Sequence, residues 1–269
     1  MKHWTLSDVP WDRFDSAKVD AEMLLVVKAA SLVERNAADY VSYLYNVFGD
    51  DLAFRADIDR WGEEEVQHGD ALGRWAELAD PSFDYGRSFQ MFRDCYSIPI
   101  DVDASVRGSR AGELVARCVV ESGTSSLYSA LRDATAEPVL KFICHKIAGD
   151  EFRHYKLFYD NMRRYQEQDR LSRARRLMVV IRRNSEVEDD ELAYAYHCAN
   201  TPEQPYDRRR AAKAYAARAI ACYRQDHIRR AVGMMLKPAG LNPNGRLSDW
   251  LTRLSWTLMQ RYARRAQAA

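Results

Sequence analysis

Residues 60–75 read RWGEEEVQHGDALGRW and place three glutamates and a histidine inside a segment that otherwise has the pattern of an amphipathic helix. Large apolar residues recur along this segment and its neighbours at steps of three and four, which is the spacing of one helix face. Glu65 and His68 fall on the face that also carries Phe54, Ile58, Trp61, Leu72 and Trp75. The sequence therefore directs a carboxylate and an imidazole toward the core, where an unpaired charge is costly.

Three other helical segments also direct a glutamate at the core. The apolar stripe of residues 16–49 contains Glu34, and that of residues 109–133 contains Glu121. In residues 138–164 the stripe contains Glu151, followed by His154. Four buried carboxylates would repel one another, and the stripes supply no lysine or arginine at this level. Two divalent ions would balance four carboxylates, so we predict a dinuclear metal site.

The spacings divide these residues into two matching halves. Glu34 precedes Glu65 by 31 residues and Glu121 precedes Glu151 by 30, and each second glutamate is followed three positions later by a histidine. Residues at i and i+3 lie on the same helix face. A helix, a turn and a second helix that together span about 30 residues bring the chain back to the same level of a bundle. A repeated Glu, Glu-x-x-His set is the ligand pattern of ferritin-like di-iron carboxylate proteins. Oxygen-rich sets with one imidazole per ion suit iron or manganese better than zinc or copper. The predicted ligands of two iron ions, with manganese possible, are Glu34, Glu65, His68, Glu121, Glu151 and His154.

The chain as a whole is predicted to be all-α, because glycine and proline are sparse and apolar residues lie three and four apart over long segments. The long helices are expected over residues 16–49, with Ser16 as N-cap, 51–80, 109–133 and 138–164. The long connection at residues 81–106 is typical of a four-helix bundle with one crossover. Later helices are expected near residues 190–199, 206–236 and 247–266. We therefore predict a ferritin-like four-helix bundle over residues 1–165, with a basic helical extension over residues 166–269 packed on it.

Composition places this chain among globular proteins. It has 269 residues, 47% of them hydrophobic, which is enough for a substantial core. No run of 18 apolar residues occurs, and the first residues lack the pattern of a secretory signal, so we expect no membrane span and a cytoplasmic location. The five cysteines are scattered and form no C-x-x-C pair, which argues against a disulfide framework and a zinc knuckle.

Charge is distributed unevenly along the chain. Residues 1–160 carry 18 Lys and Arg against 28 Asp and Glu, and residues 161–269 carry 22 against 11. Bound cations would neutralise part of the acidic half, and the basic half could face an acidic partner. The alternative is that the two halves pair with each other.

The ligand segments resemble those of the soluble acyl-carrier-protein desaturases. WGEEEVQHG, residues 61–69, is similar to that family's W-x-x-E-E-x-x-H-G signature, with a second glutamate at Glu64. IAGDEFRHYKLFYD, residues 147–160, resembles the family's I-A-x-D-E-x-R-H. The 87 residues between Glu34 and Glu121 are close to the family's separation, and the likeness covers roughly residues 20–165.

The resemblance implies roles for two further residues. In that family the aspartate before the ligand glutamate supports a metal-bound histidine, so Asp150 is expected to orient an imidazole. A threonine one turn after the glutamate of the third helix lies near the oxygen-binding face, and Thr124 in ESGTSS, residues 121–126, holds that place.

The resemblance also implies a reaction and partners. We expect a di-iron oxidase that uses O₂ and two external electrons to remove hydrogen from an unactivated C–H bond, with acyl desaturation as the leading outcome. No nicotinamide or flavin fingerprint is present, so a ferredoxin-type protein is the expected electron donor. An acyl carrier protein, or another acyl or small-molecule substrate, is the expected partner of the basic half, the chain is expected to form a homodimer, and no nucleic acid is expected. The residues that could line an acyl channel, or simply fill the core, are Phe54, Trp61, Leu72 and Phe158.

Other functions stay open. A di-iron N-oxygenase shares D-E-x-R-H and adds a third histidine, for which His197 and His227 are candidates, although both also fit solvated histidines. Ferritins and rubrerythrins, which act as ferroxidases or peroxidases, are much shorter or carry a cysteine knuckle. A ribonucleotide reductase small subunit would need a radical tyrosine on the second helix, and residues 51–80 contain no tyrosine. A helical interaction protein with a structural or vestigial metal site is the alternative from a different class.

Overall fold

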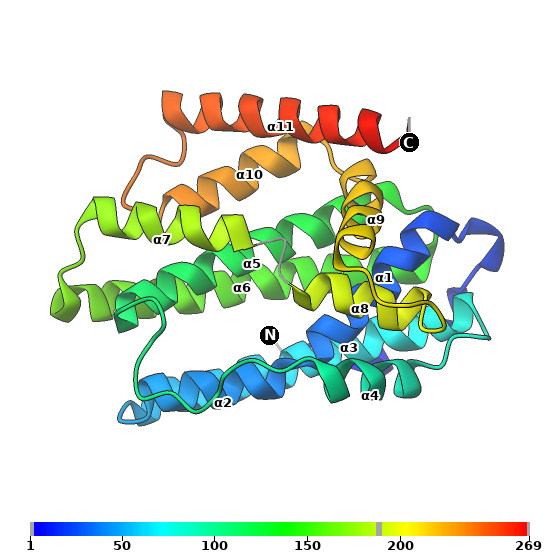
Figure 1. Ribbon diagram of the computed structural model, residues 1–269, viewed down its shortest axis with the longest axis horizontal. Coiled ribbons are helices and arrows are strands. Elements are labelled where there is room, and N and C mark those ends of the chain that lie inside the picture. The colour runs from blue at the N-terminus through cyan, green and yellow to red at the C-terminus, as the bar shows by residue number, and fades with distance from the viewer. Residues whose placement is uncertain (1–2, 187–189, 268–269) are drawn as a thin grey trace.

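The computed structural model describes residues 3–186 and 190–267, and within them the regular structure is entirely helical (Figure 1). The predicted all-α class is therefore confirmed. The four long helices around the centre are α1 (Ala21–Arg35), α3 (Leu52–Ala79), α5 (Arg110–Ala134) and α6 (Pro138–Asp169). Helix α5 packs along α6, α1 packs along α3, and α3 also contacts α6, which makes a bundle.

Side-chain caps explain where three of these helices begin. Asp51 accepts a hydrogen bond from the Phe54 N–H and starts α3, and Ser109 accepts one from the Gly112 N–H and starts α5. Both starts agree with the sequence prediction. The predicted N-cap at Ser16 is wrong, because Ser16–Lys18 form a 3₁₀ turn (η3) and α1 is capped by Asp20 instead. A side-chain oxygen at the N-cap satisfies an N–H that has no partner within the helix.

The first predicted helix, over residues 16–49, is in fact two helices. Helix α1 ends at Arg35, and α2 (Ala37–Phe48) begins after Asn36, whose ψ of 27° departs from the helical range. The Asn36 N–H bonds to the Val33 carbonyl at 3.1 Å, which is the tighter turn common at helix ends. The break lies two residues after Glu34, so the helix is interrupted beside the predicted metal ligands.

The predicted connection at residues 81–106 contains a helix that the sequence interpretation missed. Helix α4 (Tyr85–Cys95) is capped by Asp84 and buries Tyr85 and Phe92. At the end of the bundle, α6 continues past the predicted end at residue 164 and stops at Arg170, which adopts a left-handed conformation with φ of 49°.

Five helices follow the bundle: α7 (Arg173–Ser185), α8 (Asp190–Asn200), α9 (Arg208–Ala221), α10 (Gln225–Leu236) and α11 (Arg246–Gln267). The predicted helix over residues 206–236 is divided, because Arg224 is extended and its N–H bonds to Nδ1 of His227. Helix α8 packs on α1, and α7 and α10 pack on α5. Figure 1 shows α10 and α11 on one side of the α5 and α6 pair, with α2 and α3 on the other.

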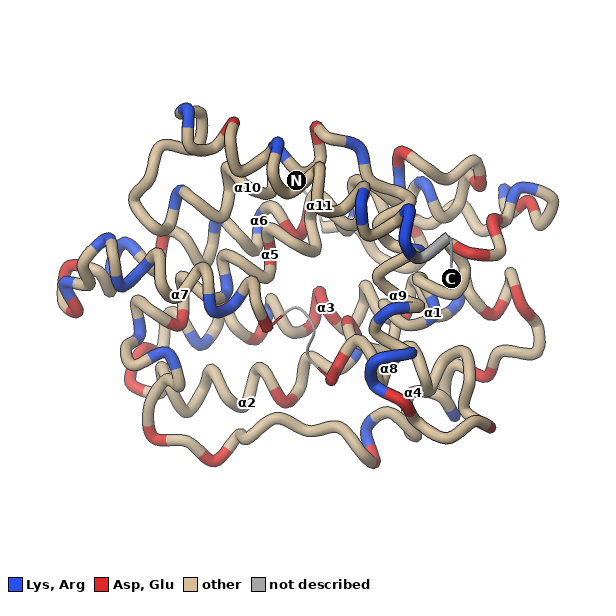
Figure 2. The backbone as a smooth tube through the Cα atoms, turned by 45° about the horizontal axis from the view of Figure 1, so that its top comes forward, with Lys and Arg blue, Asp and Glu red and all other residues tan. Residues whose placement is uncertain are grey.

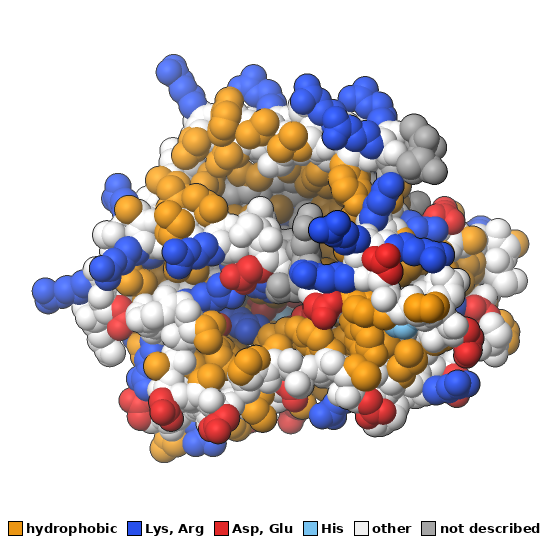
Figure 3. Space-filling model, in the orientation of Figure 1, with side chains coloured by type: hydrophobic (Ala, Val, Ile, Leu, Met, Phe, Trp, Pro, Cys, Tyr) orange, Lys and Arg blue, Asp and Glu red, His pale blue; other side chains and the backbone are white. Residues whose placement is uncertain are grey.

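The basic character of the later helices is visible on their surface. Lys and Arg are concentrated on α7 and α9 (Figure 2). Some of this charge pairs with the acidic half, since Arg218 on α9 lies 2.9 Å from Glu22. Figure 3 shows hydrophobic side chains gathered over α7 and α11. Within residues 3–186 and 190–267, none of the helices combines the length and the apolar character that a membrane span requires.

Two layers of hydrophobic core lie along the bundle, one on each side of the predicted ligands. Along α3, Phe54, Ile58 and Trp61 belong to one layer, and Leu72 and Trp75 belong to the other. The predicted polar residues of α3 lie between these groups. The fold therefore encloses a polar level in the middle of an apolar bundle, where water is largely excluded.

Candidate metal centre

The structure brings the six predicted ligands together in two overlapping groups. One group contains Glu34, Glu65, His68 and Glu151, and the other contains Glu65, Glu121, Glu151 and His154. All six residues are buried, and in each group one potential ligand atom per residue lies within 4.8 Å of the others. Glu65 and Glu151 belong to both groups, so the geometry matches two adjacent ion sites that share two carboxylates.

The histidines point the same nitrogen into the cluster. Nδ1 of His68 lies 3.2 Å from Oε1 of Glu151 and 3.5 Å from Oε2 of Glu65. Nδ1 of His154 lies 3.1 Å from Oε1 of Glu65 and 3.8 Å from Oε2 of Glu121. Both Nδ1 atoms and Oε1 of Glu151 are buried without a hydrogen-bond partner among the described residues. Buried polar atoms are almost always paired, so these atoms fit the role of metal ligands.

The opposite nitrogen of each histidine is held by a carboxylate from the facing helix. Nε2 of His68 on α3 lies 3.0 Å from Asp150 on α6, and Nε2 of His154 on α6 lies 2.8 Å from Glu64 on α3. The arrangement is reciprocal, because each carboxylate belongs to the residue just before a shared glutamate. Such contacts fix the orientation of a ligand imidazole and its tautomer. The resemblance implied this position for Asp150, whereas the matching role of Glu64 was missed, although comparing EEVQH with DEFRH would have revealed it.

The two supporting carboxylates give a matched prediction. Replacing Asp150 with Asn, or Glu64 with Gln, should weaken metal binding by about 10 to 100-fold, because the imidazole loses its orienting acceptor. The two variants should affect different ions, through His68 and His154 respectively. Titration with Fe²⁺ under anaerobic conditions measures the affinities.

Asp133 supplies the control for these variants. It makes the same kind of contact to a histidine outside the cluster, with 3.0 Å between its Oδ2 and Nε2 of His227. Asp133→Asn should leave metal affinity unchanged. Equal loss in all three variants would mean that the effect is general destabilisation rather than support of the ligands.

The N-terminal segment closes the outer side of this site, which the sequence interpretation did not foresee. The indole N–H of Trp4 donates to Asp150 at 2.6 Å, and the Trp4 ring stacks on His68 with 6.1 Å between ring centres. His3 lies 3.0 Å from the same carboxylate. Arg153 supplies positive charge, because it bonds to both Asp150 and Glu64. The supporting carboxylates are therefore themselves held in place.

The electrostatics of the cluster show why it needs positive charge. Burial, together with the neighbouring Glu65 and Glu151, raises the pKa of Glu34 well above its usual range. Burial and the same neighbours do so for Glu121. Burial alone would lower the pKa of His154, but the neighbouring carboxylates of Glu64 and Glu65 outweigh this and raise it to about 9. Bound metal ions would supply the positive charge that these buried carboxylates need.

Two hydroxyl groups contact the cluster directly. Thr124, which the resemblance placed near the oxygen-binding face, donates to Oε2 of Glu151 at 2.5 Å. Tyr128, which was missed, donates to Oε1 of Glu34 at 2.5 Å and is fully buried. Tyr128 lies seven residues after Glu121 on the same face of α5, so helix spacing alone could have placed it beside the cluster.

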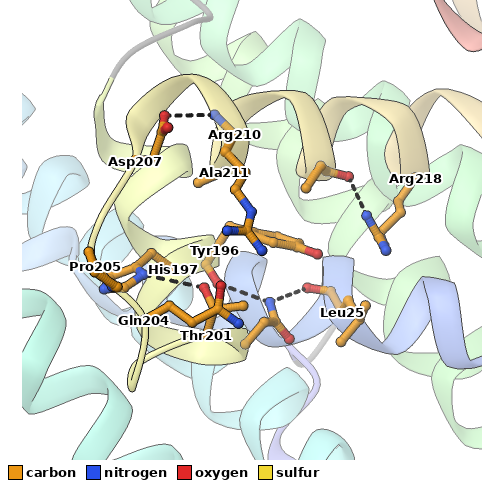
Figure 4. Close-up of a pocket in the computed structure, with 12 residues that line it drawn as sticks. Leu25, Tyr196, His197, Thr201, Gln204, Pro205, Asp207, Arg210, Ala211 and Arg218 are labelled. Carbon is orange, nitrogen blue, oxygen red and sulfur yellow. Dashed lines mark hydrogen bonds between the residues drawn. The ribbon is translucent and has the colours of Figure 1, made fainter. Parts of the chain in front are cut away.

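The structure does not bring either candidate for a third ligand histidine into the cluster. His197 lies on α8 and lines a separate pocket of about 360 Å³ between α1, α8 and α9, with Tyr196 and Arg210 beside it (Figure 4). Its Nδ1 contacts Thr201 at 3.3 Å. His227 pairs with Asp133. Both are buried, so the reading as solvated histidines is also wrong.

No protein-family model matches the chain, and no curated protein matches its sequence. The site itself therefore indicates the chemistry. Four carboxylates and two imidazole nitrogens form an oxygen-rich set, which fits two ions such as iron or manganese. The unpartnered Nδ1 atoms are the feature that this assignment explains and that a purely structural polar cluster does not.

Proposed function

We propose that this protein binds two iron ions and acts as an O₂-dependent oxidase. The observation that carries the proposal is the pair of overlapping groups, in which Glu65 and Glu151 are shared and each group adds one glutamate and one histidine. Glu34 and His68 would complete one ion site, and Glu121 and His154 the other. Manganese would fit the same donors.

The ions would supply the redox chemistry that side chains lack, namely the reduction of O₂ and the oxidation of a C–H bond. The protein holds the ligands rigid through Asp150 and Glu64. It also keeps the site between two apolar layers, where competing reactions with water are limited. Thr124 holds Oε2 of a shared carboxylate and lies on the wall of a pocket that reaches the cluster. It is therefore placed to position a proton close to the reacting centre.

Desaturation of a carrier-bound acyl chain is the finer form of this proposal. Its support is the resemblance of residues 61–69 and 147–160 to the acyl-carrier-protein desaturases. The exposed arginines at the start of α9, Arg208 to Arg210, would offer an acidic carrier a docking surface. Electrons would come from a ferredoxin-type donor, and the enzyme would act as a homodimer.

The experiment that tests the proposal is O₂ uptake by iron-loaded protein supplied with a chemical reductant. A di-iron oxidase should consume O₂ in proportion to bound iron and develop a ligand-to-metal absorption band after oxidation. Protein that holds iron but consumes no O₂ would favour the alternative of a structural metal site. Binding of many more than two iron ions per chain would favour an iron-storage function.

Thr124 gives a sharper prediction for the same assay. Thr124→Val should keep the iron content nearly intact, because the hydroxyl is not a ligand, while lowering the yield of oxidised product per O₂ consumed. The control is Thr252→Val, which removes another buried helical hydroxyl, on α11, and should leave both quantities unchanged. Unchanged coupling in Thr124→Val would remove this residue from the reaction.

A further inference from the structure

A pocket of about 80 Å³ opens directly onto the candidate metal centre. All four cluster glutamates line it, together with Thr124. The rest of its wall comes from α1, α2, α3, α5, α7 and α8 and includes the apolar residues Val33, Ala37 and Val120. The charged or polar residues of that wall are Tyr40, Trp61, Arg117, Arg183 and Glu191.

Arg117 and Trp61 of this wall lie about one helical turn from the cluster. Arg117 precedes Glu121 by four residues on α5, and Trp61 precedes Glu65 by four on α3. Four residues of helix rise about 6 Å. A small molecule is therefore long enough to touch Arg117 and also reach the cluster.

The pocket does not offer an apolar channel along the residues that the sequence suggested for an acyl chain. Phe54, Leu72 and Phe158 are at most 1% exposed and pack in the two core layers, outside the pocket lining. Trp61 alone of the four suggested residues lines the pocket. The space beside the cluster therefore matches a small molecule with a charged group better than a long alkyl chain.

Two buried atoms in the wall lack partners within the described part of the chain. They are the indole Nε1 of Trp61, which is 5% exposed, and Oε1 of Glu191, which is 8% exposed. The other oxygen of Glu191 accepts the Tyr40 hydroxyl at 2.7 Å. An unpaired donor and an unpaired acceptor in one pocket call for a ligand that offers both an acceptor and a donor.

Arg117 supplies the charge that such a ligand would meet. Its guanidinium lies over the Tyr40 ring at 4.8 Å and 5.9 Å from the centre of the Trp61 ring, which fixes the plane of the group. Its ion pair with Glu113 is long, at 3.5 Å, and uses Nε. A guanidinium held by stacking presents its N–H edge, which pairs with a carboxylate through two bonds. Arg183, the second arginine of the pocket lining, lies 3.5 Å from Glu186.

We propose that this pocket is the substrate site and that it binds a small organic carboxylate with an N–H or O–H donor beside it, as in amino acids and 2-hydroxy acids. The carboxylate would meet Arg117 and the indole N–H of Trp61. The donor group would meet Glu191, and the remaining carbon atoms would face the shared glutamates. This assignment rests on the proposed oxidase function, because it names the substrate of that same centre.

The test is calorimetric binding to protein loaded with Mn²⁺, and to metal-free protein. The probes are L-valine, L-leucine, their 2-hydroxy analogues, the corresponding amides without a carboxylate, and octanoyl-pantetheine as an acyl thioester. At least one acid should bind, and its amide should bind about 30-fold more weakly or worse, as expected when a buried arginine loses its charged partner. Arg117→Gln should lose the same factor for the acid, and Glu191→Gln should weaken it too.

Metal content separates this inference from the proposed function. Arg117→Gln should still hold two ions, and Arg132→Gln, a change on α5 outside the pocket, should bind both ions and acid as the unchanged protein does. Three results would show that the substrate class is wrong while the metal centre stands. The protein could bind two ions but no acid, it could bind the acid equally well after Arg117→Gln, or it could bind octanoyl-pantetheine instead. Failure of the unchanged protein to hold metal would instead defeat the proposed function.

Discussion

Replacing either shared carboxylate, by Glu65→Ala or Glu151→Ala, is expected to remove both metal ions from the protein. Each of these residues belongs to both overlapping groups, so its loss takes a ligand from two ions at once. Glu34→Ala or Glu121→Ala should cost about one ion, because each belongs to a single group. Elemental analysis after loading with iron and desalting measures ions per chain.

The control is Glu113→Ala, which removes another buried carboxylate from α5. Glu113 accepts hydrogen bonds from Tyr43 and Ser105 and lies outside both groups, so this variant should retain two ions. Circular dichroism establishes that each variant is folded. Equal losses in Glu34→Ala and Glu65→Ala would contradict the assignment of shared and unshared ligands.

Removing the metal is expected to lower the melting temperature substantially. In the absence of ions, four carboxylates lie buried together, and ions that bind only the folded chain stabilise it by mass action. At a free metal concentration of about 1,000 times Kd, one site contributes about 4 kcal/mol, which shifts the melting temperature on the order of 10 °C. Differential scanning calorimetry with and without a chelator measures the shift.

Variants of the two shared glutamates make the prediction about melting temperature specific. Glu65→Ala and Glu151→Ala should melt at the same temperature with and without added Fe²⁺ or Mn²⁺. A metal-dependent shift that persists in both variants would place the stabilising ion elsewhere on the chain. A metal-independent melting temperature in the unchanged protein would argue that the cluster is not a metal site.

The cluster residues could be predicted because their signal is local and repeated. A charged residue on an apolar helix stripe is visible in the sequence, and Glu65 with His68 and Glu151 with His154 give the same signal twice. The caps at Asp51 and Ser109 were equally local. Glu64 could have been found by the same comparison, because it holds the place in one half that Asp150 holds in the other.

Other features depend on contacts between distant residues. The break at Asn36 rests on a helix preference of less than about 1 kcal/mol, which packing can override in either direction. Trp4 reaches Asp150 across 146 positions of sequence, from a segment of short 3₁₀ turns that carry no long periodic signal. The pocket also depends on distant contacts, since it requires α2 and α8 to be placed beside the cluster.

Some signals were local but misread. Helix α4 has an aspartate cap at Asp84 and buries Tyr85 and Phe92, seven residues apart on one face. The prolines, serines and aspartates of residues 81–106 made this stretch look like a simple connection. The division after Ala221 was hidden because Arg224 is an ordinary helix former, and only its bond to His227 shows the new start.

The most direct test of the central claim is a crystal structure of the iron-loaded protein with anomalous diffraction measured at the iron edge. We expect two iron peaks about 3.5 to 4 Å apart. One should be bound by Nδ1 of His68 and the other by Nδ1 of His154, with Glu65 and Glu151 touching both. A single peak, a peak outside this cluster, or a lone zinc ion that iron does not displace would contradict it.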